Sequence, residues 1–113
     1  MILPIKMIGN NLPKLSKKQF ENHIRQAAKE SINVSITVHA LARMNERGIN
    51  RSMVLDVLKH GLIRKTPEPD IKHPGTKCQV ERYVSGINVA VVVNVDFPSE
   101  GLIVITVFEV TRG

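Results

Sequence analysis

Three side chains near the middle of the chain have the types and spacing to bind an anion. His39, Arg43 and Arg47 follow one another at intervals of four residues, which places them on one side of a helix on successive turns. Guanidinium groups hold phosphate through paired hydrogen bonds, and an imidazole changes its protonation near neutral pH. The spacing therefore favours an anionic partner, first of all phosphate. The alternative is a solvated helix face on which Glu46 pairs with one of the arginines.

The helices that must position these side chains are predicted within residues 16–61, where apolar residues recur at helical spacing. Ser16 is expected to cap a first helix that extends over about residues 17–30. Thr37 can cap the second helix, which carries the three side chains, and Gly48 can end it.

The third predicted helix begins after Asn50 as its cap and ends at Gly61, which is expected to adopt a left-handed conformation. This helix and the preceding one have the outline of a helix-turn-helix DNA reader. Asp56 counts against that interpretation, because its carboxylate would lie near the DNA backbone.

From residue 77 onward the apolar period changes to two, which predicts an antiparallel meander of three strands over residues 77–110. The preceding segment, residues 66–75, contains three prolines and is predicted to be a loop. Helices followed by such a sheet predict one α+β domain over residues 1–113, in which the helices cover one face. Residues 1–15 are expected to form an irregular start or an edge strand.

The charge of the chain is unevenly distributed. Residues 1–65 carry twelve Lys and Arg against four Asp and Glu, whereas residues 66–113 carry four against six. The two halves therefore have net charges of +8 and −2, which agrees with the total of +6. A basic half attracts polyanions and favours RNA or another nucleic acid as the partner. Because there are three Phe, one Tyr and no Trp, contacts to phosphate and sugar are expected rather than base stacking.

Several classes of protein are disfavoured by the sequence. Residues 1–8 contain Pro and Lys and resemble neither a signal peptide nor a membrane anchor, so we expect a cytoplasmic protein without a membrane partner. The single cysteine, Cys78, permits no internal disulfide and no metal site by itself, and we expect neither metal nor cofactor. The long apolar strands leave an edge for self-pairing, so monomer and homodimer both stay open.

Four features together resemble the family called domain of unknown function 4258. They are the pattern His-x3-Arg-Met-x2-Arg-Gly-Ile at residues 39–49, a Val-x2-Val-Leu-x2-Gly helix at 54–61, a β-hairpin over 78–95, and the closing Ile-Thr-Val-Phe at 105–108. The resemblance covers about residues 34–110. That family is similar in proposed fold to RNases of the barnase, EndoU, colicin and RelE types. The resemblance therefore implies a RelE/barnase-like fold and a metal-independent RNase or an RNase-like module.

Cleavage of RNA without a metal needs a base for the 2′-hydroxyl, an acid for the departing 5′-oxygen, and cations for the charge that develops on phosphate. His39 is our candidate for proton transfer, because it is the only histidine in a patterned site. Arg43 and Arg47 are the candidates for holding the phosphate.

The strands supply further candidates for the same site. Thr106 on the last strand and either Glu81 or Arg82 on the first strand of the meander can complete it. Because side chains alternate between the two faces of a strand, only one of Glu81 and Arg82 can face the site.

A second hypothesis is a binding module without catalysis, such as a phage- or plasmid-type regulator. Its support is the absence of a second patterned histidine and of an assured general-base carboxylate. In that case the basic helices would bind RNA, DNA or an acidic protein. A neutralising protein partner stays open under the RNase hypothesis as well.

Overall fold

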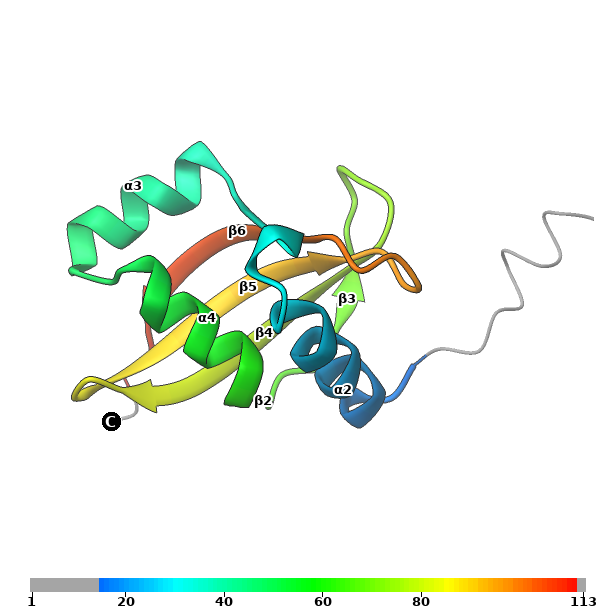
Figure 1. The fold of residues 1–113 in the computed structure, drawn as a ribbon, viewed down its shortest axis with the longest axis horizontal. Helices are drawn as coiled ribbons and strands as arrows, with labels where there is room; N and C mark the ends of the chain where they lie inside the picture. The colour runs from blue at the N-terminus through cyan, green and yellow to red at the C-terminus, as the bar shows by residue number, and fades with distance from the viewer. Residues whose placement is uncertain (1–14, 112–113) are drawn as a thin grey trace, which may run out of the picture.

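Helices α2 and α4 lie on one face of a six-stranded sheet, and helix α3 packs along strand β6 (Figure 1). The structure is a computed structural model, and it describes residues 15–111. The expectation for residues 1–14 lies outside that range. In chain order the elements are α2 (Lys17–Ala28), the 3-10 helix η1 (Ser31–Asn33), β1 (Val34–Ile36), α3 (Val38–Arg47), α4 (Arg51–His60), β2 (Leu62–Ile63), β3 (Glu68–Pro69), β4 (Thr76–Val84), β5 (Ile87–Val95) and β6 (Leu102–Glu109).

The three α-helices begin where short polar side chains can satisfy their first N–H groups. Ser16, Thr37 and Asn50 each accept a hydrogen bond from the backbone N–H three residues later, at 3.1, 3.0 and 2.9 Å. Gly48 ends α3 in the left-handed conformation with φ of 68°. These local predictions are confirmed, although the first helix ends at Ala28, before residue 30.

Gly61 ends α4 as predicted, but the predicted left-handed conformation is wrong. Its φ is −78° and its ψ is 175°, so the backbone is extended and not left-handed. A Cβ at this position would lie 2.6 Å from the carbonyl oxygen of Val57 and 2.7 Å from Cγ1 of Val80. Glycine is therefore needed for space, because α4 passes directly into β2 against strand β4.

The sheet has the strand order β1-β6-β5-β4-β2, and β3 also pairs with β4. Strands β4, β5 and β6 form the predicted antiparallel meander. The sheet as a whole is mixed, however, because β1 runs parallel to β6 with Val34 opposite Leu102. The predicted loop over residues 66–75 contains the two-residue strand β3, where Pro69 occupies a sheet edge that tolerates a missing N–H.

The two faces of the sheet differ in composition. The face toward the helices carries buried apolar side chains, such as Val89, Val91 and Val93 of β5, which join the helices in one core. Their neighbours along the strands point to the opposite side. That side, which we call the open face, carries Lys77, Gln79 and Glu81 on β4, Val92 on β5 and Thr106 on β6. None of the described helices is long and apolar enough to cross a bilayer.

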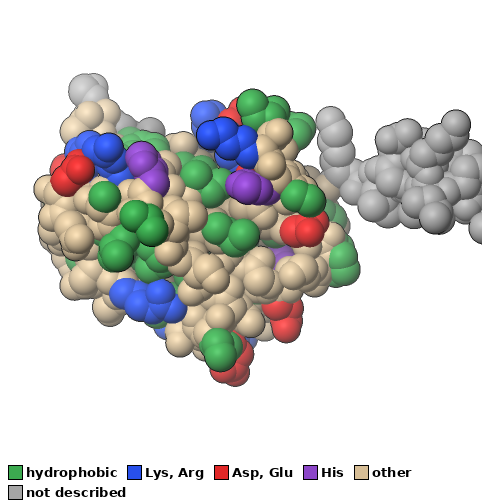
Figure 2. Space-filling model, turned by 90° about the horizontal axis from the view of Figure 1, so that it is seen from above, with side chains coloured by type: hydrophobic (Ala, Val, Ile, Leu, Met, Phe, Trp, Pro, Cys, Tyr) green, Lys and Arg blue, Asp and Glu red, His purple; other side chains and the backbone are tan. Residues whose placement is uncertain are grey.

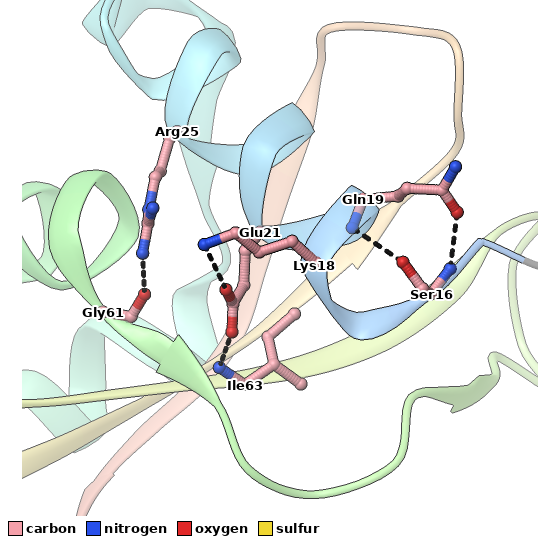
Figure 3. A network of polar contacts seen from close by, with 7 residues as sticks. All are labelled: Ser16, Lys18, Gln19, Glu21, Arg25, Gly61 and Ile63. Atoms are coloured by element: carbon pink, nitrogen blue, oxygen red, sulfur yellow. Dashed lines mark hydrogen bonds and ion pairs between the residues drawn. The ribbon is translucent and has the colours of Figure 1, made fainter.

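Helix α2 is tied to the connection between α4 and β2 by two polar side chains (Figure 3). The buried carboxylate of Glu21 accepts the backbone N–H of Ile63 at 2.7 Å. One turn later, Nη2 of Arg25 donates to the carbonyl of Gly61 at 3.1 Å. These bonds satisfy backbone groups at a place where the chain changes from helix to strand.

Candidate functional site

A hollow of about 220 Å³ lies on the open face of the sheet. We call it the sheet hollow. It is lined by Lys65, Thr66, Glu68, Lys77, Cys78, Gln79, Val92, Ile105 and Thr106. Its floor includes one row of the register, in which Gln79 of β4 pairs with Val92 of β5 and Val92 pairs with Thr106 of β6. The hollow therefore combines hydroxyl, amide, ammonium and carboxylate groups with apolar residues such as Val92.

Two ammonium groups and one carboxylate set the charge of the sheet hollow. Nζ of Lys77 lies 3.7 Å from Oε1 of Glu68, whereas Lys65 has no such ion pair among the described residues. The lining therefore has an excess of one positive charge, which attracts anions.

The carboxylate of Glu81 is beside this hollow and is already engaged. Nε2 of Gln79 donates to Oε2 of Glu81 at 3.0 Å, and Nε of Arg64 lies 3.8 Å from Oε1. Only about 9% of Glu81 is exposed. Glu81 therefore fixes the amide of Gln79 in place at the edge of the hollow.

The cysteine at this site is structural. Cys78 is fully buried and belongs to the core between the sheet and the helices. Burial raises the pKa of its thiol to about 12, because a thiolate would lose its hydration there. Cys78 is therefore no nucleophile at neutral pH.

Helix α3 carries the histidine and the arginine of the predicted site on one flank. Ala40 and Met44 are its buried residues, and they form a stripe toward β6. His39 and Arg43 each come one residue before a member of that stripe. Both side chains therefore project from the helix about 100° away from the stripe, in the same direction around the helix axis. In Figure 1, α3 runs alongside β6 while α4 lies in front of the sheet. His39 and Arg43 therefore share one flank of α3, next to the surface of the helix that packs against β6.

The start of α3 is fixed beside the sheet hollow by Thr37. Its backbone N–H donates to the carbonyl of Val104 at 3.1 Å, and its hydroxyl donates to the carbonyl of Ile105 at 3.2 Å. Ile105 itself lines the hollow, and His39 follows Thr37 by two residues. Figure 2, in which the molecule is seen from above, shows histidine side chains next to Lys and Arg side chains at two places.

The three helical candidates have different surroundings. His39 is exposed in the first turn of α3, and Arg47 is exposed in the last turn. Nη1 of Arg43 lies 2.6 Å from Oε1 of Glu46. This ion pair is the one that the solvated-face alternative predicts. None of the three side chains lines the sheet hollow.

The strand candidates are separated by the alternation of β4. Glu81 is on the open face, whereas Arg82 points to the side of α4, where its Nε donates to Oδ2 of Asp56 at 3.0 Å. Arg82 therefore ties the sheet to α4 and does not face the hollow. Thr106 does line the hollow.

Five polar lining residues escaped the sequence analysis: Lys65, Thr66, Glu68, Lys77 and Gln79. The period of two along β4 puts residues 77, 79 and 81 on one face, which is a usable signal once Glu81 is a candidate. Lys65 carries no such signal, because it precedes the proline-rich segment. Between residues 15 and 111, no group of three or more His, Cys, Asp and Glu side chains is arranged to hold a metal ion.

A comparison with models of protein families found a match to this chain. The model described as "Domain of unknown function (DUF4258)" matches residues 36–109. This range includes α3, α4 and the strands that line the sheet hollow. Comparisons with curated proteins and with solved structures gave no match. Because the match spans more than half of the sequence, the chain belongs to the DUF4258 family.

Proposed function

We propose that this protein is a metal-independent RNase-like protein that binds RNA over the open face of its sheet. We also propose that its fold is related to that of the RelE and barnase types of RNase. One observation carries the proposal: Thr37, two residues before His39, bonds to the carbonyl of Ile105, which lines the sheet hollow together with Thr106.

The lining of the sheet hollow suits the sugar-phosphate backbone. Lys65 and Lys77 provide positive charge for a phosphate, and the amide of Gln79 and the hydroxyl of Thr106 provide neutral hydrogen-bonding groups. The single Tyr and the absence of Trp agree with a site that does not depend on base stacking.

Arg43 is available to a phosphate despite its ion pair with Glu46. The pair of Arg43 and Glu46 is exposed, and such pairs contribute little to stability. Exchange of a carboxylate for a phosphate oxygen therefore costs little, and the guanidinium is suited to either partner.

In the reaction that we propose, His39 takes the proton of a 2′-hydroxyl. The 2′-oxygen forms a bond to phosphorus, the bond from phosphorus to the 5′-oxygen breaks, and the departing oxygen takes a proton from water. Arg43 and the lysines of the hollow stabilise the charge on the phosphate oxygens. The products are a 2′,3′-cyclic phosphate and a 5′-hydroxyl end.

Incubation of the purified protein with RNA in EDTA tests the proposal. The protein is expected to generate 2′,3′-cyclic phosphate ends, and His39→Ala is expected to reduce the rate by about 100-fold or more. His73→Ala is the matched control, because His73 is also exposed but lies in the loop between β3 and β4 and lines neither hollow. Cleavage by His39→Ala at the rate of the unchanged protein, or no cleavage at all, would contradict the RNase proposal.

A second candidate function is RNA binding without cleavage. It is favoured by the lining of the sheet hollow, which contains no histidine and whose one carboxylate, Glu68, is paired with Lys77. In this case RNA binding is salt-dependent and leaves the RNA intact. Lys77→Gln is expected to reduce the slope of log affinity against log salt by about one, as for one lost phosphate contact.

A further inference from the structure

A second hollow, of about 350 Å³, lies between α2 and α4 on the helix side of the molecule. We call it the α2–α4 hollow. Its lining residues are Asn22, Arg25, Gln26, Lys29, Lys59 and His60. All six side chains are polar, three of them are permanently cationic, and none is a carboxylate. Neighbouring cations without an acidic partner repel one another, so the site favours an added anion.

Arg25 has one hydrogen-bonding group that nothing in the described part of the chain satisfies. Its Nη2 donates to the carbonyl of Gly61 at 3.1 Å, and Figure 3 shows the side chain reaching from α2 to that carbonyl. Its Nε is buried and has no partner; it is the only buried side-chain nitrogen or oxygen of residues 15–111 in this condition. Buried donors of native proteins nearly always have an acceptor, because an unsatisfied one costs free energy.

Asp56, whose carboxylate contacts the lining residue His60, is already paired with Arg82. Oδ1 of Asp56 lies 3.9 Å from Nε2 of His60, and Oδ2 of the same residue accepts from Nε of Arg82 at 3.0 Å. Asp56 therefore does not compensate the charges of Lys29, the residue that caps the end of α2, and Lys59 of α4.

We propose that the α2–α4 hollow binds a phosphate group of a phosphorylated ligand. One phosphate oxygen accepts the N–H of Arg25 Nε once the flexible side chains around it move aside, and the other oxygens accept from Lys29 and Lys59. A tetrahedral anion with several acceptor oxygens can serve donors on two helices at once, which an acidic protein surface does less well inside a concave site. This site is separate from the sheet hollow and does not depend on the RNase proposal.

The phosphate can belong to a small polyphosphate or to an RNA backbone, and two titrations distinguish these sources. The probe is the Nε–H signal of Arg25 in ¹H–¹⁵N spectra of the full chain at constant ionic strength. Inorganic pyrophosphate is expected to shift this signal in a saturable manner. A short single-stranded RNA that saturates the shift at lower concentration than pyrophosphate would assign the site to RNA, and the reverse order would assign it to a small polyphosphate.

Charge-matched variants control for the net charge of the protein. Lys29→Gln and Lys59→Gln are each expected to weaken pyrophosphate binding by about five- to tenfold, as for loss of one charge-assisted hydrogen bond. Lys72→Gln removes the same charge from an exposed position before β4 and is expected to change binding by less than about twofold. A shift that never saturates, equal losses in all three variants, or a shift with an acidic peptide and none with pyrophosphate would overturn the proposal.

Discussion

The hydroxyl of Thr37 bonds to the backbone of Ile105 and thereby joins the first turn of α3 to strand β6. It donates to the carbonyl of Ile105 at 3.2 Å and accepts the backbone N–H of Ala40 at 3.0 Å. Ile105 lies at the β-bulge of β6, where Thr106 pairs with Val92 and Val104 pairs with Val93. Thr37 therefore anchors the turn that carries His39 to the strand that contributes Ile105 and Thr106 to the sheet hollow.

Thr37→Val keeps the shape of the side chain and removes both hydrogen bonds. We expect the free energy of unfolding to fall by about 1–2 kcal/mol, because the helix cap is lost and the carbonyl of Ile105 loses a donor. Urea denaturation followed by circular dichroism measures this change. Thr37→Ser, which retains the hydroxyl, is expected to recover most of the loss, and an unchanged midpoint in the valine variant would show that the cap contributes nothing.

Gly61 and Gly48 are expected to respond differently to substitution. Gly61→Ala places a Cβ 2.6 Å from Val57 O and 2.7 Å from Val80 Cγ1, and overpacking of this kind costs about 1–3 kcal/mol. The Cβ of Gly48→Ala has no other atom within 4 Å. The expected loss of about 1 kcal/mol in the free energy of unfolding therefore comes from the positive φ.

Asparagine distinguishes these two causes. Gly48→Asn is expected to be less destabilising than Gly48→Ala, because asparagine tolerates the left-handed conformation. Gly61→Asn is expected to be at least as destabilising as Gly61→Ala, because it is larger. Thermal melts of the four variants check this, and a Gly61→Ala melt equal to that of the unchanged protein would argue against the close contact of α4 with β4.

Asp70 is expected to make stability fall at low pH. Its carboxylate accepts the backbone N–H of Lys72 at 2.9 Å and the amide of Asn94 at 2.9 Å, and these bonds lower its pKa. Because the pKa is lower in the folded state, the stabilisation is fully present above the ordinary value of about 3.9 and is lost as pH falls through the folded value. Carbon NMR titration of the Asp70 carboxyl group measures the shift.

A variant of the donor identifies the origin of this effect. Asn94→Ala removes the amide and leaves the backbone donors, so the pKa of Asp70 is expected to rise toward its ordinary value. Asp70→Asn is expected to remove this contribution to the acid dependence altogether. A titration midpoint that is the same with and without the Asn94 amide would contradict the assignment.

Much of the helical part could be predicted because its determinants are local. A cap, an apolar stripe and a terminal glycine are within one or two turns of each other, as Thr37 and Gly48 are in α3. Gly61 was misinterpreted because its constraint comes from Val80 on a strand far along the chain. The parallel pairing of β1 with β6 has the same origin, since nothing within Val34–Ile36 indicates its partner.

Only the locally determined part of the candidate site could be predicted from the sequence. The flank of His39 and Arg43 follows from helical spacing, whereas the contribution of the strands depends on register. Because side chains alternate along a strand, only one of Glu81 and Arg82 could face the site. The hydrogen bond from Arg82 to Asp56 shows that Arg82 faces α4 instead. Lys65 joins the hollow because β3 folds the chain back along β4, which no local pattern reveals.

The pairing of Val34 with Leu102 also has a consequence for synthesis on the ribosome. The chain emerges in order, so the short strand β1 must wait for almost seventy further residues before its neighbour exists. The same delay applies to Thr37, whose acceptor on Ile105 is made later still. Until then the nascent helices have no sheet to cover, and the first turn of α3 has no anchor on β6.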